Sequence, residues 1–153
     1  MENMNIIELK NRPNISTDIK LSKIYSQFEV LLSELKKKEL PQNIITTINK
    51  SVEQINSSTL TGTQLGKLVI QNQTTILKQT EKELKIVPKN HYLYLGTGLG
   101  ISLLGILIGL FIGQLLFGLP IGMLIGIIIG SAMDKKAFNE GRQLNLEIKN
   151  WIY

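Results

Sequence analysis

The chain has 153 residues and a net charge of +5, a length that allows one membrane hairpin and a small further region but excludes two large domains. It contains no cysteine, which excludes disulfide bonds and thiol chemistry. Basic residues outnumber acidic ones by 13 to 9 in residues 1–91 and by 4 to 3 in residues 134–153, whereas the 42 residues between them carry no charge.

Residues 1–15 are expected to be loosely structured, because Pro13 and four asparagines disfavour a regular element. Residues 16–90 are predicted to form a helical region on the cytoplasmic side of a membrane. Its first helix should begin near Ser16–Asp18 and end at the basic run Lys36–Lys38, since cations are favourable at the C-terminus of a helix.

Two further helices are expected in this region. Pro41 can occupy the first turn of the second helix, because its fixed φ suits that position. Thr61 and Gln64 match a capping box, and a third helix would run from there to about Val87. Pro88 then disfavours helical backbone at the residue before it, so this helix should stop short of the apolar run that follows.

The first two helices each carry a seam of apolar residues with alternating three- and four-residue spacing, which is typical of coiled-coil-like packing. Such seams usually form the core of a small bundle. They can also be surfaces for assembly with further copies or with a cytosolic protein partner. The seam residues are Leu21, Ile24, Phe28, Leu31 and Leu35 in the first helix, and Ile45, Ile48, Val52 and Ile55 in the second.

The uncharged run Tyr92–Met133 is long enough to cross a bilayer twice, because a spanning helix needs about 20 apolar residues. We therefore predict a transmembrane helical hairpin over residues 91–133, with its turn near residues 114–119. Asn90 can cap the first span, and Pro120 can occupy the first turn of the second span.

Lysines flank the predicted hairpin on both sides, whereas its turn is uncharged. The positive-inside rule then places both termini in the cytoplasm and, in a bacterium, the hairpin in the inner membrane. The basic sequence pI near 9.4 is explained in the same way, so membrane lipid is the expected partner and nucleic acid is not. The N-terminal residues lack the basic and apolar regions of a secretory signal, and insertion would therefore depend on the hairpin itself.

Glycine recurs at every fourth position through the hairpin, in two series. Such spacing forms a flat groove along one helix face, and in lipid close backbone packing through small residues is what holds helices together. The two grooves could face each other and hold the hairpin closed, or one could pack against neighbouring copies and form a homo-oligomer. The helix-packing glycines are Gly105, Gly109 and Gly113, followed by Gly118, Gly122, Gly126 and Gly130.

Polar side chains in and beside the run are few. Within the run only Thr97, Ser102, Gln114 and Ser131 could belong to a polar pore lining, and the residues considered for a pore or a turn are Ser102, Gln114 and Asp134. Gln114 is expected at the turn, near lipid headgroups. Asp134 is expected to be solvated and balanced by Lys135 and Lys136. A ring of Asp134 carboxylates at a pore mouth, which would select cations, is the alternative.

A charged cytoplasmic helix is predicted for residues 134–153. Its apolar positions keep a helical spacing of four and three residues, and no proline follows position 120 to stop it. The spaced positions are Ala137, Gly141, Leu144, Ile148 and Trp151.

Residues 92–146 resemble small bacterial glycine-zipper membrane proteins. The resemblance lies in the segment Gly105–Gly130, in the Ser131–Lys136 stretch that follows it, and in the sequence Gly141–Leu144. It implies a two-span hairpin and self-association, and it implies no defined activity. Residues 1–90 carry no such resemblance.

The sequence gives no indication of catalysis. It has one histidine, no HExxH motif and no phosphate-binding loop with its lysine. No catalytic, cofactor-binding or metal-binding residue is therefore predicted, and we expect no enzyme and no cofactor.

The predicted fold class is all-α: a two-helix transmembrane hairpin with a cytoplasmic N-terminal helical region and a short C-terminal helix. The leading functional hypothesis is a self-assembling inner-membrane protein that acts on the membrane as an oligomeric channel or disruptive effector, as holins, toxins and phage-defence proteins do, with the cytoplasmic helices controlling assembly. The alternative is a non-enzymatic membrane-anchored scaffold or adaptor that recruits a cytosolic partner.

Overall fold

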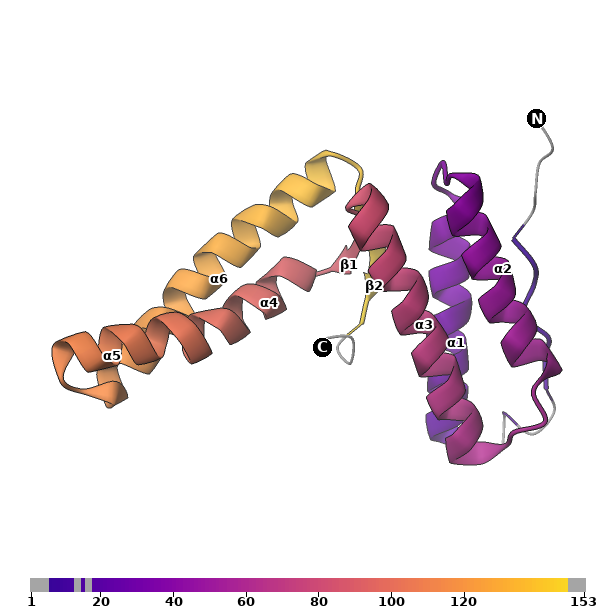
Figure 1. Cartoon of the computed structure of the whole chain (residues 1–153), viewed down its shortest axis with the longest axis horizontal. Helices are drawn as coiled ribbons and strands as arrows, with labels where there is room; N and C mark the ends of the chain where they lie inside the picture. Colours follow the sequence, from indigo (N-terminus) through magenta and orange to yellow (C-terminus); the bar gives the residue numbers. More distant parts are fainter. Residues whose placement is uncertain (1–5, 13–14, 16–17, 149–153) are drawn as a thin grey trace. The chain divides into compact units, whose positions relative to one another are not determined.

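The computed structural model describes residues 6–12, 15 and 18–148, and it divides the chain into an N-terminal unit, Met1–Lys85, and a C-terminal unit, Ile86–Tyr153 (Figure 1). Both units are mainly helical, as predicted. The prediction of an all-α fold is wrong in one respect, because the C-terminal unit also contains a two-stranded sheet.

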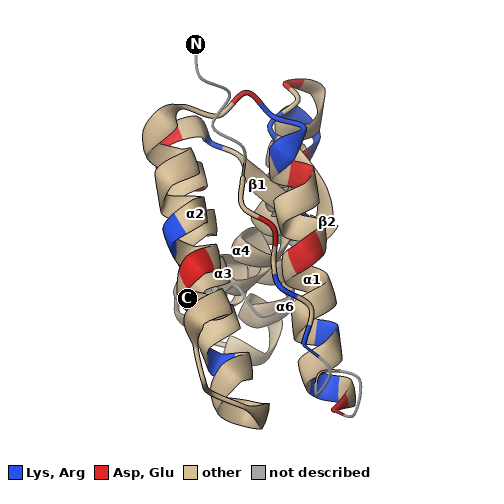
Figure 2. Cartoon of the chain, turned by 90° about the vertical axis from the view of Figure 1, so that its right-hand side faces the viewer, with Lys and Arg blue, Asp and Glu red and all other residues tan. Residues whose placement is uncertain are grey.

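The N-terminal unit contains three helices: α1 (Ile19–Lys36), α2 (Gln42–Ser57) and α3 (Gly62–Leu84). Helix α3 contacts both α1 and α2. Figure 2 shows basic and acidic residues interspersed along α1 and α2. Such a surface is typical of helices that face water.

Local sequence explains where these helices begin and end. The Asp18 carboxylate accepts hydrogen bonds from the amides of Lys20 at 2.9 Å and Leu21 at 3.1 Å, which satisfies free donors in the first turn of α1. Pro41 precedes α2 as its cap residue. Lys85 ends α3 in the left-handed conformation, with φ 56°, and the helix therefore stops before Val87.

The core of the N-terminal unit consists of large apolar side chains from all three helices. Seven of the nine predicted seam residues are buried. Ile24 and Ile45 are only half-buried, and their neighbours Tyr25 and Ile44 are buried in their place. The largest fully buried side chains of this unit are Phe28, Leu31, Leu35, Ile44, Ile48, Ile55, Ile76, Leu77, Val52 and Val69.

Residues 6–12 were predicted to be loose, and they do lack a regular helix or strand. They are nevertheless fixed to α2 by hydrogen bonds. The amides of Ile7 and Lys10 donate to the side-chain oxygens of Asn49 and Asn56 at 2.9 and 2.8 Å. The Arg12 guanidinium donates to the carbonyls of Ile55 and Ser58 at 2.6 and 2.7 Å, and so satisfies acceptors at the end of α2.

The C-terminal unit begins with strand β1 (Val87–Lys89) and continues into a helical hairpin. The first arm, His91–Ile112, consists of α4 (His91–Leu99), the π-helical segment η2 (Gly100–Gly105) and α5 (Ile106–Ile112). The second arm is α6 (Leu115–Asn139), and strand β2 (Gln143–Glu147) follows it. The strands are parallel, with Val87 opposite Gln143 and Lys89 opposite Glu147.

The turn of the hairpin is tighter than predicted. The first arm ends at Ile112, and the next residue, Gly113, has a φ of 76°, in the left-handed region that glycine adopts without steric cost. Helix α6 begins at Leu115, directly after Gln114, so most of the predicted turn, residues 114–119, is helical. Pro120 therefore lies inside α6 and not in its first turn as predicted.

The predicted C-terminal helix over residues 134–153 is wrong beyond Asn139. Gly141 has a φ of 68°, and this left-handed residue ends the helical path. The chain then forms β2, in which Leu144 is buried while Asn145 is exposed, an alternation that suits a strand. Trp151 lies outside the described residues.

Candidate functional site: a glycine-packed helical hairpin

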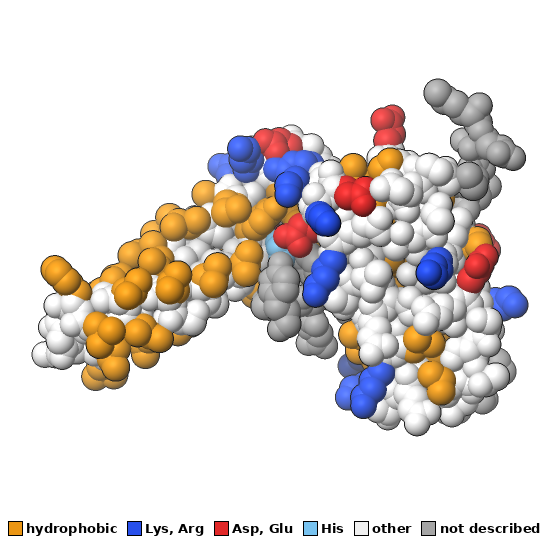
Figure 3. Space-filling model, viewed as in Figure 1, with side chains coloured by type: hydrophobic (Ala, Val, Ile, Leu, Met, Phe, Trp, Pro, Cys, Tyr) orange, Lys and Arg blue, Asp and Glu red, His pale blue; other side chains and the backbone are white. Residues whose placement is uncertain are grey.

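Hydrophobic side chains are spread along the hairpin on the face that Figure 3 shows, and no charged side chain lies among them over most of its length. Phe111 is 94% exposed, Leu116 80% and Ile128 68%. Both arms are long and apolar enough to cross a membrane, with a mean hydropathy of 2.2 each. Exposing so large an apolar surface to water is energetically unfavourable. A contiguous apolar surface of this kind indicates contact with lipid or with another apolar partner.

The inner face of the hairpin is made of glycine on both arms. A Cβ placed on Gly96 or Gly100 would lie closer than 3.0 Å to the carbonyl oxygen of Gly126 or Gly122, respectively. Closer to the turn, a Cβ on Gly105 would lie 2.9 Å from the Cα of Leu119, and one on Gly109 would lie 2.8 Å from the Cα of Leu115. The backbones of the two arms therefore touch along the hairpin, with no room for a side chain between them.

The π-helical segment explains why the first arm keeps its glycines on one face. The contacting glycines of that arm are spaced by four, five and four residues: Gly96, Gly100, Gly105 and Gly109. A five-residue step would turn a regular α-helix away from its partner, since each residue rotates the chain by ~100°. The wider π turn, Gly100–Gly105, absorbs the extra residue.

The predicted glycine series is accordingly corrected on the first arm. Gly113 lies in the turn, is exposed, and would have nothing within 4 Å of an added Cβ. Gly96 and Gly100 take part in the packing and were missed, because the prediction followed strict four-residue spacing. On the second arm the four glycines keep that spacing, and all are buried against the first arm: Gly118, Gly122, Gly126 and Gly130.

Asp134 has a different role from the one predicted. It is 7% exposed, and its carboxylate accepts hydrogen bonds from the amides of Tyr92 at 3.2 Å and Leu93 at 2.8 Å. These amides are free donors at the start of α4, and a negative charge is favourable there. Asp134 therefore caps the first arm from the second arm. The expected cap residue, Asn90, has a left-handed backbone and makes no side-chain cap bond.

The other polar residues of the hairpin do not form a stripe. The Ser102 hydroxyl is exposed and donates to the Gly98 carbonyl of its own helix at 2.8 Å. Gln114 is exposed at the turn, as expected, where it precedes α6. Asp134 is buried between the arms, and so it cannot present its carboxylate to a pore mouth in this closed form of the hairpin. A water-filled pore needs a continuous polar lining, which these positions do not supply.

The small sheet supplies a second closure at the open end of the hairpin. The Val87 amide donates to the Arg142 carbonyl at 3.0 Å, and the side chains of Val87 and Leu144 are fully buried. The Tyr94 hydroxyl donates to the Glu147 carboxylate. The C-terminal end of the second arm and the strand after it thus bind the start of the first arm twice, through Asp134 and through Glu147 of β2.

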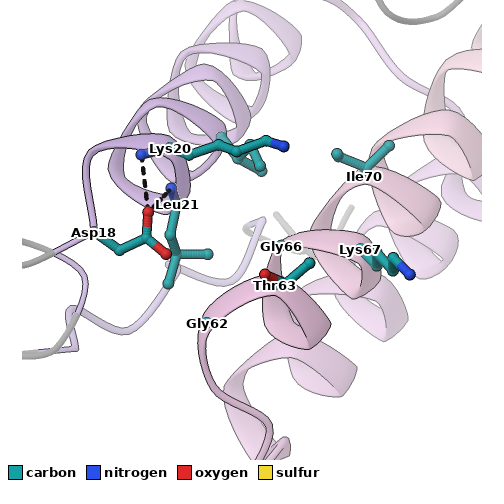
Figure 4. A pocket seen from close by; sticks show the side chains of 9 residues that line it. Asp18, Lys20, Leu21, Gly62, Thr63, Gly66, Lys67 and Ile70 are labelled. Atoms are coloured by element: carbon teal, nitrogen blue, oxygen red, sulfur yellow. Dashed lines mark hydrogen bonds between the residues drawn. The ribbon is translucent and has the colours of Figure 1, made fainter.

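A small pocket lies in the N-terminal unit, between the starts of α1 and α3 (Figure 4). Its cavity volume is about 120 Å³, and Lys20 and Lys67 stand at its rim. Figure 4 shows the Asp18 carboxylate directed at the amides of α1, so it is already engaged as a helix cap. The pocket therefore offers a shallow, partly apolar surface and no arrangement of groups for catalysis.

The part of the chain that the structure describes contains no set of metal ligands. Within residues 6–12, 15 and 18–148, no three histidine, cysteine, aspartate or glutamate side chains lie close enough together to hold a metal ion.

Comparisons with family models, with curated proteins and with solved structures gave no match to this chain. The resemblance to glycine-zipper membrane proteins therefore remains a prediction, and function has to be argued from the hairpin itself.

Proposed function

We propose that this protein is a non-enzymatic membrane anchor, in which the hairpin inserts into the bilayer and carries the N-terminal unit as a cytoplasmic module for a protein partner. One observation carries the proposal: large apolar side chains cover the outside of the hairpin, and its inside is filled by backbone. A bilayer is the solvent in which that arrangement is stable, because lipid contacts the side chains and the arms gain from close backbone packing.

The geometry supports an anchor better than a channel. Gly122 and Gly126 are both in contact with the first arm, so the second glycine face is not available to a neighbouring copy while the hairpin is closed. Among the described residues, no polar stripe runs along the hairpin for water to follow. The proposed orientation places both ends of the hairpin in the cytoplasm of a bacterium, since lysines lie at both ends.

A self-assembling effector is the second candidate, and one observation favours it. Gly98 faces open space, and Ser102, four residues later, is exposed as well. Two small residues at this spacing allow close approach of another helix. In this candidate, copies would assemble through the outer face of the first arm and disrupt the membrane.

Two measurements on the full chain test the proposal. Bacterial membranes that contain the protein are washed at alkaline pH and treated with protease from either side. An inserted hairpin resists extraction, and its N-terminal unit is cleaved from the cytoplasmic side alone. Recovery of the protein in the soluble fraction would overturn the proposal.

The second measurement is dye leakage from liposomes that contain the purified protein. An anchor leaves the liposomes as tight as protein-free ones. Leakage that disappears in Gly98→Leu but persists in Ile128→Leu would favour the effector, because only the first substitution fills the outer small-residue face.

A further inference from the structure

An apolar groove of about 360 Å³ runs along one side of the hairpin, between α4–η2 and α6. Its glycine floor comes from both arms: Gly96, Gly100, Gly126 and Gly130. Its walls include Leu99 and Leu103 from the first arm and Ile129 and Met133 from the second. Its lining side chains are apolar, apart from the hydroxyl of Tyr92 at one end.

The length of the groove limits what can occupy it. On the first arm the lining runs from Tyr92 to Leu104, which corresponds to ~18 Å of helix. This is close to one leaflet of the hydrocarbon core, which is ~15 Å thick. A spanning helix of a second copy would have to follow the whole length of an arm, whereas an acyl chain extends through one leaflet only.

The charged groups at the Tyr92 end favour an anionic headgroup. Lys136 follows Met133 by three residues and Ile129 by seven, so it continues the groove face of α6. Its side chain is 73% exposed, and its ammonium lies 4.0 Å from the Glu140 carboxylate. The Arg142 guanidinium, which also pairs with Glu140, reaches the Tyr92 hydroxyl. The nearby Asp134 carboxylate is turned inward onto the α4 amides.

We infer that this groove binds one acyl chain of an anionic glycerophospholipid from the cytoplasmic leaflet, with the phosphate beside Lys136 and Arg142. The inference rests on the proposed membrane insertion of the hairpin. An acyl chain would lie on the glycine floor of the groove, in a space that no large side chain of either arm fills. The site would make the anchor selective for membrane regions rich in anionic lipid.

The test uses the full chain in phosphatidylcholine vesicles that contain a trace of phosphatidylglycerol with a photoactivatable acyl chain. Insertion is measured first by alkaline extraction, so that failure of the anchor and failure of the lipid site are separate results. Crosslinks are then mapped by mass spectrometry. We expect them to concentrate on the groove walls, at Leu99, Leu103, Ile129 and Met133. Even labelling of the outer faces, or crosslinks between two copies within the groove, would overturn the inference.

Two pairs of variants sharpen the test. Ile129→Trp fills the groove and should abolish the concentrated crosslinks, whereas Ile128→Trp places the same side chain on the outer face and should preserve them. Lys136→Gln should lower the ratio of the crosslink yield with phosphatidylglycerol to that with photoactivatable phosphatidylcholine by about fivefold. This factor corresponds to the about 1 kcal/mol that one lysine near the membrane surface contributes to binding anionic lipid. Lys135→Gln, on another face of α6, should change that ratio less. Equal effects of the two lysine variants would overturn the headgroup assignment.

Discussion

The two units of the molecule bury opposite kinds of residue. In the N-terminal unit Phe28, Leu31 and Ile48 are fully buried, and the described charged residues other than Glu34 lie wholly or partly exposed. In the hairpin most buried positions are glycines, and Phe111 and Leu116 are among the most exposed side chains. One chain thus carries one unit with an apolar core and another whose large apolar side chains lie on the outside.

With the hairpin in the bilayer proposed for it, the two units depend on different forces. In water, burying apolar surface contributes about 25 cal/mol for each Å² and favours large side chains in the core. In lipid that contribution disappears between helices, because the acyl chains are as apolar as leucine. Close approach of backbones remains, and the contact between Gly96 and Gly126 exemplifies it. Substitutions of the same type should therefore have effects of very different size in the two units.

The largest effect is expected for phenylalanine to alanine substitutions compared between units. Phe28→Ala should lower the free energy of unfolding of the N-terminal unit by about 4 kcal/mol, because it leaves a cavity in a closed core. Phe111→Ala removes the same atoms from a side chain that is 94% exposed, and it should leave the hairpin folded as before. Chemical denaturation in detergent, followed by circular dichroism, measures both. Equal destabilisation by the two variants would contradict the comparison.

Within the hairpin, enlarging a glycine should be destabilising only where the two arms touch. Gly126→Leu forces a side chain into the backbone of the first arm and should destabilise the closed hairpin by about 3 kcal/mol. Gly98→Leu is the matched control, because nothing lies within 4 Å of a Cβ at that position. Unfolding by sodium dodecyl sulfate in mixed micelles provides the readout. The packing described here would be refuted by a hairpin that tolerates both substitutions equally.

Removing the Asp134 cap should have an intermediate effect on the hairpin and none on the N-terminal unit. Asp134→Ala leaves the Tyr92 and Leu93 amides without their acceptor and should cost about 1–2 kcal/mol. Asp134→Asn keeps one carbonyl oxygen and should retain part of the stability. Hydrogen exchange at the Leu93 amide reports the effect directly. If exchange there were as slow in the alanine variant as in the parent protein, the cap would not be formed.

The smallest effect concerns a polar group in the core of the N-terminal unit. Among the described residues, the buried Tyr25 hydroxyl has no hydrogen-bond partner. Tyr25→Phe should therefore leave stability at neutral pH unchanged or raise it by about 1 kcal/mol. A loss of more than that would mean that the hydroxyl has a partner.

The same residue predicts a pH dependence. Burial raises the pKa of Tyr25 above its ordinary value of 10.0, Arg12 opposes this shift, and Glu29 adds to it. Because the pKa of Tyr25 is raised in the folded state, the free energy of unfolding keeps its full value below pH 10. It falls as the pH rises further, since the unfolded chain then loses the Tyr25 proton more readily than the folded one. Denaturation between pH 9 and 11 should show a decline that is smaller in Tyr25→Phe, and identical declines would contradict the assignment.

Periodic features of the sequence were sufficient to predict the helices. The alternation of apolar residues located α1 and α2, and the uncharged run located both arms. Apolar spacing is a local property of the chain, and it follows the helix directly. The shifts from Ile24 to Tyr25 and from Ile45 to Ile44 arise because the direction from which α3 packs is not encoded in the spacing alone.

The missed features depend on contacts between distant residues. Asp134 was expected in solvent because its neighbours are lysines, but its partners are amides 41 and 42 positions earlier. The π turn became necessary only when Gly96 and Gly109 had to meet one partner helix. Strand β2 could have been recognised from Gly141, which commonly ends helices, and from the alternation of Leu144, Leu146 and Ile148 after it.

The closure of the hairpin by Asp134 and β2 has a consequence for biosynthesis. A ribosome releases the first arm well before residues 134–147, so the start of α4 leaves the exit tunnel without its cap and β1 without its partner strand. In the proposed membrane anchor, the insertion machinery would therefore hold an open first arm until residues 134–147 have been made. Truncated nascent chains that end before Asp134 should remain bound to that machinery, whereas chains extended past Glu147 should be released as a closed pair.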